Sequence, residues 1–218
     1  MSIASLSTTS NSVVVLGNVD WKTYETLRAI DANRNVRMTY DKGALILMSP
    51  SKLHERVAEL LAQLVMVWTE VFEIPRLSAG STTIKKKLLK QGFEPDKCFY
   101  IQHEAEVRGR EEFDADIDPP PDLSIEVDVT STSTERMPLY AAFGIPEIWR
   151  WYDEQIVVYK LVDRDYQQVQ DSACLPGFPF DEASRTLTRR LDYDETLLIR
   201  EFRALAERLR KAWSQPGQ

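Results

Sequence analysis

Acidic and apolar residues alternate along the segment that follows a proline triplet. In a β-strand, where successive side chains point to opposite faces, Asp122, Ser124, Glu126 and Asp128 share one face and the apolar residues between them share the other. Three carboxylates on one face repel each other unless a positive charge compensates them. Magnesium fits this role because it favours one or two carboxylates together with water and substrate phosphate. The pattern therefore points toward metal-dependent phosphate chemistry; a half-exposed strand with one polar face is the alternative interpretation.

Three further segments carry residues suited to such a site. Asp96 follows Pro95 at the start of an expected strand, where a carboxylate can face a cleft, although a turn aspartate fits the same pattern. Glu55 begins a long helix and could support a metal site, or could be a first-turn acid favoured by the helix dipole. His54 beside it is expected to be a surface or capping residue. Arg136 could stabilise charge on a phosphate, or could belong to a solvated helix face.

The elements that would position these residues follow from periodicity and turn residues. Apolar residues at helical spacing predict helices over residues 21–32, 53–72, 135–143 and 194–213. Runs of strand-forming residues predict strands over residues 36–40, 44–48, 81–88, 97–102, 122–129, 147–151, 155–161 and 167–171. Asp41-Lys42-Gly43 indicates a hairpin between the first two strands, because glycine adopts positive φ. With no internal repeat and no dividing linker, the mixture predicts one α/β domain of mixed α+β type.

Length and composition indicate one soluble domain. The 218 residues suffice for a substantial core, and we expect a flexible N-terminal tail over residues 1–15 and a single domain over residues 16–218. Hydrophobic residues make up 43% of the chain and no apolar run reaches membrane-spanning length, so no membrane partner is expected. Cys98 and Cys174 are too few for a disulfide framework and lack metal-ligand spacing, which favours a cytoplasmic protein with reduced thiols.

The charge balance constrains the partners. A net charge of −7 argues mildly against a nucleic-acid partner, because phosphate binding depends on Lys and Arg. Local charge counts for more than the total, and a basic cluster is a candidate for nucleic-acid binding: Lys85, Lys86, Lys87 and Lys90. The chain has no P-loop, dinucleotide-binding, zinc-protease or serine-hydrolase motif and only two histidines. Among enzymes, this composition favours chemistry by carboxylates and a metal ion.

The order of these motifs resembles the Uma-type restriction endonuclease family of the PD-(D/E)XK nuclease superfamily. A helix that begins with His-Glu is followed by an Asp-bearing strand, by Pro-Pro-Pro-Asp-Leu-Ser-Ile-Glu-Val-Asp-Val-Thr and by Leu-Tyr-Ala-Ala-Phe-Gly-Ile-Pro-Glu-Ile-Trp-Arg. The resemblance extends from residue 20 to residue 161 and more loosely to the end of the chain. It implies a restriction-endonuclease-like core, with a mixed central β-sheet flanked by helices, and a phosphodiesterase site that uses Mg²⁺ or Mn²⁺.

The resemblance also implies roles for individual residues. By position, Asp96 matches the strand aspartate that binds the metal, and Glu126 matches the acid of the family's E-x-K element. Asp122 matches the aspartate that recurs just before the second metal-binding strand, so Asp96, Glu126 and Asp122 are the expected metal ligands. Glu55 matches a helix acid that supports the site, and Asp128 is a second supporting acid.

The lysine of the family motif is replaced in this chain. Asp128 stands two residues after Glu126, where the lysine is expected. Family members often supply the lysine from the next helix instead, four residues before a tyrosine, and here that position is Arg136, before Tyr140. Arginine stabilises phosphate charge but does not readily deprotonate, so it is a poor general base. The replacement bears on turnover more than on fold.

Two functions are therefore expected. The first is a metal-dependent endonuclease that hydrolyses DNA phosphodiester bonds, with Asp96, Glu126, Asp122 and Arg136 as catalytic residues. The alternative is a catalytically degenerate domain of the same fold that binds nucleic acid or a protein partner. Cleavage of both strands of a duplex needs two sites, and a homodimer would supply them.

Overall fold

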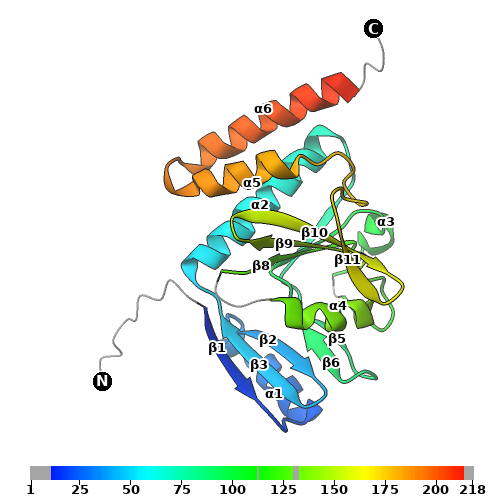
Figure 1. The fold of residues 1–218 in the computed structure, drawn as a ribbon. Coiled ribbons are helices and arrows are strands. Elements are labelled where there is room, and N and C mark those ends of the chain that lie inside the picture. The colour runs from blue at the N-terminus through cyan, green and yellow to red at the C-terminus, as the bar shows by residue number, and fades with distance from the viewer. Residues whose placement is uncertain (1–10, 112, 130–132, 214–218) are drawn as a thin grey trace.

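The computed structural model describes residues 11–111, 113–129 and 133–213, apart from the side chains of residues 133 and 134. Two β-sheets lie one above the other with a helix between them, and three more helices cover the far side of the larger sheet (Figure 1). The α-helices of the described ranges are α1 (Trp21–Ala29), α2 (Lys52–Val71), α3 (Glu104–Val107), α4 (Met137–Phe143), α5 (Phe180–Thr188) and α6 (Glu195–Trp213). Short 3-10 helices are η1 (Asp31–Asn33), η2 (Ser133–Arg136) and η3 (Arg189–Leu191).

The larger sheet has six strands in the order β11-β10-β9-β8-β7-β4. Its strands are β4 (Leu77–Gly80), β7 (Lys97–Tyr100), β8 (Leu123–Val127), β9 (Glu147–Tyr152), β10 (Gln155–Val162) and β11 (Asp165–Val169). Strands β8 and β9 are parallel and are joined through α4, whereas the other neighbouring pairs are antiparallel. The sheet is therefore mixed, and β8 lies in its interior.

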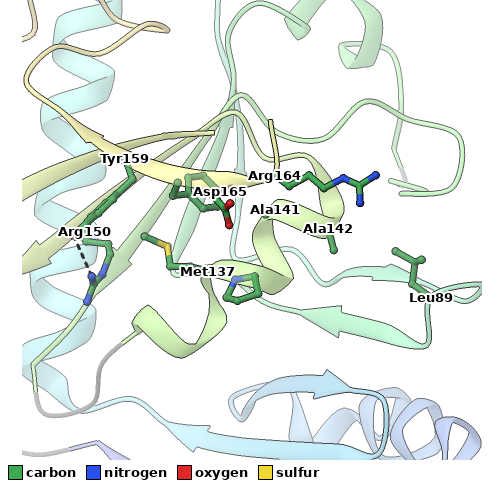
Figure 2. Close-up of a pocket in the computed structure, with 10 residues that line it drawn as sticks. Leu89, Met137, Ala141, Ala142, Arg150, Tyr159, Arg164 and Asp165 are labelled. Carbon is green, nitrogen blue, oxygen red and sulfur yellow. Dashed lines mark hydrogen bonds between the residues drawn. The ribbon is translucent and has the colours of Figure 1, made fainter. Parts of the chain in front are cut away.

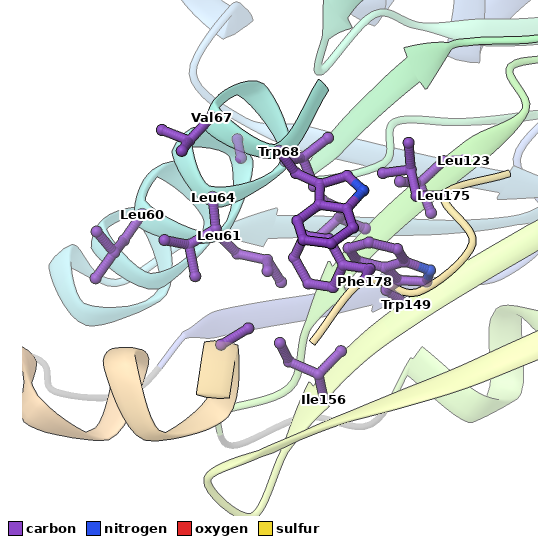
Figure 3. Packing of buried hydrophobic residues seen from close by; sticks show 14 of the residues in the cluster. Leu60, Leu61, Leu64, Val67, Trp68, Leu123, Trp149, Ile156, Leu175 and Phe178 are labelled. Carbon is purple, nitrogen blue, oxygen red and sulfur yellow. The ribbon is translucent and has the colours of Figure 1, made fainter. Parts of the chain in front are cut away.

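The main core lies between this sheet and helices α2, α5 and α6. Ser51 caps α2 by accepting a hydrogen bond from the backbone N–H of His54, and the apolar stripe of α2 then packs on the sheet. Trp68, Trp149 and Phe178 meet at the centre of this core (Figure 3), where Trp68 and Trp149 are fully buried. Close packing of this face leaves the opposite face of β8 available for polar residues.

The smaller sheet has five antiparallel strands in the order β1-β3-β2-β6-β5. Its strands are β1 (Ser12–Leu16), β2 (Arg37–Asp41), β3 (Ala44–Ser49), β5 (Ile84–Lys86) and β6 (Gln91–Phe93). Positive φ at Lys42 and Gly43 forms the two-residue turn between β2 and β3. A Cβ at Gly92 would lie 2.5 Å from Tyr24 Oη, so the packing of β6 against α1 requires glycine.

Most predicted elements are confirmed, with boundaries that differ by a few residues. The mixed sheet flanked by helices is confirmed, as is the hairpin at residues 41–43. Residues 1–10 of the predicted flexible tail lie outside the described residues. The prediction over residues 1–15 is wrong at its end, because β1 begins at Ser12 and pairs with β3. The single strand over residues 81–88 is also wrong: β5 ends at Lys86 and a turn leads into β6. Helices α3 and α5 and strands β1, β4 and β6 are not predicted, because short or weakly alternating segments give little periodic signal.

Cys98 and Cys174 are both buried, and neither forms a disulfide bond. Within the part of the chain that the structure describes, none of the helices combines the length and the apolar character needed to cross a bilayer.

Candidate active site

Asp96 and Glu126 are brought together by the antiparallel pairing of β7 and β8. Lys97 pairs with Ile125, so the next position along this register places Asp96 opposite Glu126. Both residues are fully buried, and the backbone N–H of Val127 donates a 2.7 Å hydrogen bond to Oδ2 of Asp96. The predicted convergence of these two carboxylates is thus what the strand register produces. The alternative of a half-exposed strand is wrong, since β8 is buried on both faces.

Asp96 is held between a histidine and an arginine. Nε2 of His54 lies 3.1 Å from Oδ2 of Asp96, and Nε of Arg37 lies 3.8 Å from Oδ1. Burial alone would raise the pKa of Asp96, but the hydrogen bond to His54 and the charges of His54, Arg37 and Arg136 outweigh it and lower the pKa. Asp96 therefore stays ionised, and its Oδ1 is buried without a hydrogen-bond partner.

His54 is fully enclosed rather than exposed, so its interpretation as a surface or capping residue is wrong. Burial would lower the pKa of its imidazole, but the hydrogen bond to Asp96 and the Asp96 charge raise it above its ordinary value. His54 lies in the first turn of α2, and its backbone N–H donates to the Ser51 cap, so the cap fixes the position of His54 against Asp96. Two residues that the sequence did not assign to the site, His54 and Arg37, are therefore direct neighbours of Asp96.

Glu126 is bonded through both carboxylate oxygens. Tyr140 Oη donates a 2.5 Å hydrogen bond to Oε1, and Arg136 Nη2 donates a 2.6 Å hydrogen bond to Oε2. Burial raises the pKa of Glu126, the Arg136 charge opposes this rise and the Asp96 charge adds to it, so that the pKa reaches about 7. The guanidinium of Arg136 thus supplies positive charge where the row of carboxylates was expected to need a cation. Its alternative interpretation as part of a solvated helix face is wrong.

Glu55 reaches the pair through Arg37 and, at 3.9 Å from Nδ1, through His54. Oε1 of Glu55 accepts a 2.9 Å hydrogen bond from Nη2 of Arg37, whose Nη1 donates to the backbone oxygen of Pro95. These bonds hold the Arg37 guanidinium beside Asp96. Glu55 therefore supports the site by orienting Arg37. Its own side chain is 45% exposed.

The structure does not bring Asp122 together with Asp96 and Glu126. Asp122 lies four residues before Glu126, which corresponds to about 13 Å along a strand. Its carboxylate accepts hydrogen bonds from the backbone N–H groups of Ile101 and His103 and pairs with the ring of His103 at 2.5 Å. The prediction that groups Asp122 with the two converging carboxylates is therefore wrong in its geometry, and Asp122 instead shapes the turn after β7.

Asp128 is also occupied by a partner of its own. Nε of Arg150 donates a 3.0 Å hydrogen bond to Oδ2 of Asp128, and Nη2 contacts the same oxygen. Each of the three acids on this face of β8 thus has cationic or hydrogen-bonding partners of its own, and the three are not gathered around a single ion. In the described part of the chain no group of three or more His, Cys, Asp or Glu side chains is arranged to hold a metal ion.

The four lysines of the predicted nucleic-acid cluster lie on the hairpin of β5 and β6, at the edge of the smaller sheet. Lys85 lies 3.6 Å from Glu25, and the ammonium of Lys86 lies over the ring of Phe143. Lys87 and Lys90 close the turn, where the backbone N–H of Lys90 donates to the oxygen of Lys87. Lys85, Lys87 and Lys90 are exposed and Lys86 is half-buried, and the hairpin belongs to the smaller sheet, whereas β7 and β8 belong to the larger one.

A cleft of about 600 Å³ lies between the smaller sheet and the segment formed by η2 and α4. Arg37 and Arg136 both line it, so the cations that contact Asp96 and Glu126 also face the opening. A second groove of about 670 Å³ shares Arg37 and adds Arg28 and Arg34. An extended anion in either opening would therefore meet arginine close to the buried carboxylates.

Asp96 and Glu126 could together hold one hard divalent cation, and two carboxylates suit a single ion better than a cluster of ions. Asp96 is ionised and carries a buried oxygen without a hydrogen bond, and Glu126 lies opposite it on the next strand. Two carboxylates, with water and phosphate completing the shell, match the preference of magnesium. Arg136 donates a hydrogen bond to one oxygen of Glu126, so a bound cation would share that carboxylate with the guanidinium.

A mixed sheet with helices on both sides and two converging strand carboxylates define a restriction-endonuclease-like nuclease. The chain belongs to the Uma2 family, described as "Putative restriction endonuclease", whose pattern matches residues 21–186. A crystal structure of a "putative nuclease belonging to DUF820" from Anabaena variabilis is similar, with 16% identity and a TM-score of 0.45 over 76% of this chain and 90% of that one. No sequence match is found among curated proteins.

Proposed function

We propose that this protein is a metal-dependent endonuclease that hydrolyses phosphodiester bonds in DNA. The observation that carries the proposal is the pairing of Asp96 with Glu126 across β7 and β8, with an ionised Asp96 whose Oδ1 accepts no hydrogen bond and two arginines facing the adjoining cleft. Membership of the Uma2 family supports a nucleic-acid substrate. Asp122 has no part in the proposed site.

Each side chain of the site has a distinct task in this proposal. Asp96 and Glu126 would hold Mg²⁺ or Mn²⁺, and the bound ion supplies a water of lowered pKa and positive charge next to the phosphate. His54 keeps Asp96 ionised, and Tyr140 orients Glu126 through its hydroxyl. Arg37 and Arg136 bind the phosphate from the cleft and stabilise the negative charge that develops on it. Neither arginine serves as the base, because a guanidinium keeps its proton.

Cleavage of supercoiled plasmid DNA with Mg²⁺ or Mn²⁺ tests the proposal directly. The wild type is expected to nick or linearise the plasmid, and E126Q and D96N are expected to lose at least a hundredfold in rate. E70Q is the matched control, because Glu70 pairs with Arg203 on the surface. A wild type that leaves DNA intact, or an E126Q variant as active as the wild type, would contradict the proposal.

A second candidate function has its own supporting observation. Tyr140 and Arg136 already satisfy both oxygens of Glu126, and Asp128 stands at the position of the family lysine and pairs with Arg150. Such a site fits a domain that binds nucleic acid or a protein without cleaving it. Calorimetric titration with Mn²⁺ separates the two functions, because a degenerate site takes up no ion, whereas the nuclease binds Mn²⁺ and loses that binding in D96N.

The expected homodimer is part of the same proposal. Two copies would present two carboxylate pairs, one for each strand of a duplex. Sedimentation of the purified protein with and without duplex DNA measures the stoichiometry, and linear plasmid formed without a nicked intermediate would accompany a dimer.

A further inference from the structure

A second pocket of about 820 Å³ lies beside α4, on the side away from the cleft (Figure 2). Its walls come from α4, from β10 and β11 and from the tip of the β5–β6 hairpin. Pro138 borders both the pocket and the cleft, so the first turn of α4 separates them. No step of the proposed hydrolysis uses this pocket, although it is close to the site.

The lining of the pocket suits a flat ligand that combines apolar faces with polar edges. Tyr159 and Tyr166 line it together with the small side chains of α4. Both rings are held in place, since Tyr166 Oη donates a 2.6 Å hydrogen bond to the backbone oxygen of Ile145 and the guanidinium of Arg150 lies over the Tyr159 ring. Aromatic faces fixed in this way are surfaces on which a nucleobase stacks.

The rim of the pocket carries both signs of charge. Arg164 and Asp165 lie side by side at the turn between β10 and β11, and both line the opening (Figure 2). A guanidinium binds phosphate, and a carboxylate accepts hydrogen bonds from the N–H groups of a base edge. With Lys87 and Lys90 on the neighbouring hairpin, this rim is locally basic in a chain of net charge −7.

The hairpin also presents an apolar residue to solvent at its tip. Leu88 is 92% exposed, and Leu89 beside it lines the pocket. Lys87 and Lys90 flank these two leucines. Leucine side chains flanked by cations can insert between base steps of a duplex and unstack them, while the cations bind the backbone.

We propose that this pocket accepts a single unstacked nucleobase of the bound nucleic acid, and that Leu88 inserts into the base step from which that base leaves. The proposal rests on the proposed function, because it assumes that nucleic acid is the substrate. It deepens that function by adding a requirement for an unpaired or easily unpaired base. Extrusion costs least at a mismatched or bulged nucleotide, so such sites should be preferred.

Binding of two fluorescent DNA duplexes, identical except for one bulged nucleotide, tests this proposal. The full chain without added metal is titrated into each duplex, and anisotropy gives the two dissociation constants. The wild type is expected to bind the bulged duplex about tenfold more tightly, equal to about 1.4 kcal/mol. A142L fills the pocket from an exposed position of α4 and should abolish the preference while leaving affinity for the paired duplex unchanged.

Two further variants separate the pocket from general effects. A204L makes the same substitution on the exposed surface of α6 and should keep the preference. L88A removes the inserting side chain and should also reduce the preference, without loss of folding because Leu88 is almost fully exposed. Equal binding of both duplexes by the wild type, or an A142L variant that keeps its preference, would overturn the nucleobase pocket and leave the nuclease proposal standing.

The other outcomes are equally decisive. If neither duplex binds, the DNA substrate of the proposed function fails and the pocket proposal fails with it. If the hairpin instead binds phosphatidylglycerol vesicles in a manner lost in L88A, and shows no preference between duplexes, then the tip is a membrane contact and the nucleobase proposal is overturned.

Discussion

Replacement of Arg136 by methionine should destabilise the protein in a strongly pH-dependent way. Arg136 donates to Oε2 of Glu126 at 2.6 Å, and the side chains of the two residues are 16% and 0% exposed. In R136M the Glu126 carboxylate loses its cation while it remains buried. Methionine has a similar volume and is apolar, so the charge is the main property that changes.

The magnitude follows from the burial of the pair. Removal of one partner of a buried ion pair costs about 3–5 kcal/mol. Because Arg136 is partly exposed, we expect a loss of about 3 kcal/mol at pH 8.5. The charge of Arg136 lowers the pKa of Glu126, so without it the pKa rises above about 7. At pH 5.5 Glu126 is already protonated in the folded wild type, and the loss should therefore be smaller there.

Urea denaturation at pH 5.5 and pH 8.5 measures both quantities. A double-mutant cycle with E126Q isolates the interaction of the pair, because the double variant buries no unpaired charge from either residue. R136M/E126Q should be more stable than R136M at pH 8.5 by about 1–3 kcal/mol. R203M is the matched control: Arg203 bonds to both oxygens of Glu70 on the surface, and its loss should have little effect at either pH.

Two results would refute this reasoning. The first is a loss in R136M that is equal at pH 5.5 and pH 8.5, because the ionisation of Glu126 would then have no bearing on the contribution of the arginine. The second is additivity of R136M and E126Q at pH 8.5, since it would mean that the two side chains do not interact in the folded protein.

Three other predictions concern stability. The pKa of Glu126 is raised from 4.5 to about 7 on folding and that of His54 is also raised, so the folded state binds more protons and stability should increase as the pH falls from about 7 to about 4.5. Urea midpoints of the wild type should show this increase, on the order of 3 kcal/mol from Glu126, and E126Q should have a flatter profile. E147Q should lower the free energy of unfolding by about 2–3 kcal/mol in the same urea assay. The buried Glu147 carboxylate accepts hydrogen bonds from Trp149 Nε1, Ser172 Oγ and two backbone N–H groups. An unchanged urea midpoint would contradict this role. W68A should lower the free energy of unfolding by about 3–5 kcal/mol, because it leaves a cavity in the core. W213A changes a side chain that is 57% exposed and should lower it much less. Thermal unfolding measures both variants, and equal losses would contradict the assigned core.

The sequence predicts that Asp96 and Glu126 lie together, but it does not predict which other acids of β8 lie with them. Alternation shows which residues of β8 share a face, and it shows nothing of which neighbour lies opposite each of them. Asp122 lies on the same face of β8 as Glu126, but it is not part of the site. Its carboxylate accepts hydrogen bonds from the bend that follows β7. The register of β7 against β8 decides the membership of the site, and the register depends on long-range pairing.

The missed residues have the same explanation. His54 follows no metal-ligand spacing, and Arg37 is one of 27 basic residues in the chain, with no motif around it. Each becomes significant only when α2 and β2 pack beside the start of β7. Strand β1 follows a segment rich in Ser and Thr, and its apolar residues do not alternate with polar ones, so the sequence pattern that marks a half-buried strand is absent there.

Arginine at position 136 suits this site for a reason that the family motif alone does not give. Asp96 and Glu126 are both fully buried, and two carboxylates so placed need a permanent positive charge in the absence of an ion. A buried lysine can lose its proton and with it this role, whereas a guanidinium keeps its charge. Arg136 therefore stabilises the acids without a metal and gives up proton transfer. In the proposed nuclease, activation of the attacking water would therefore be left to the bound ion. The side chain that stabilises the site without an ion would then also limit the rate with one.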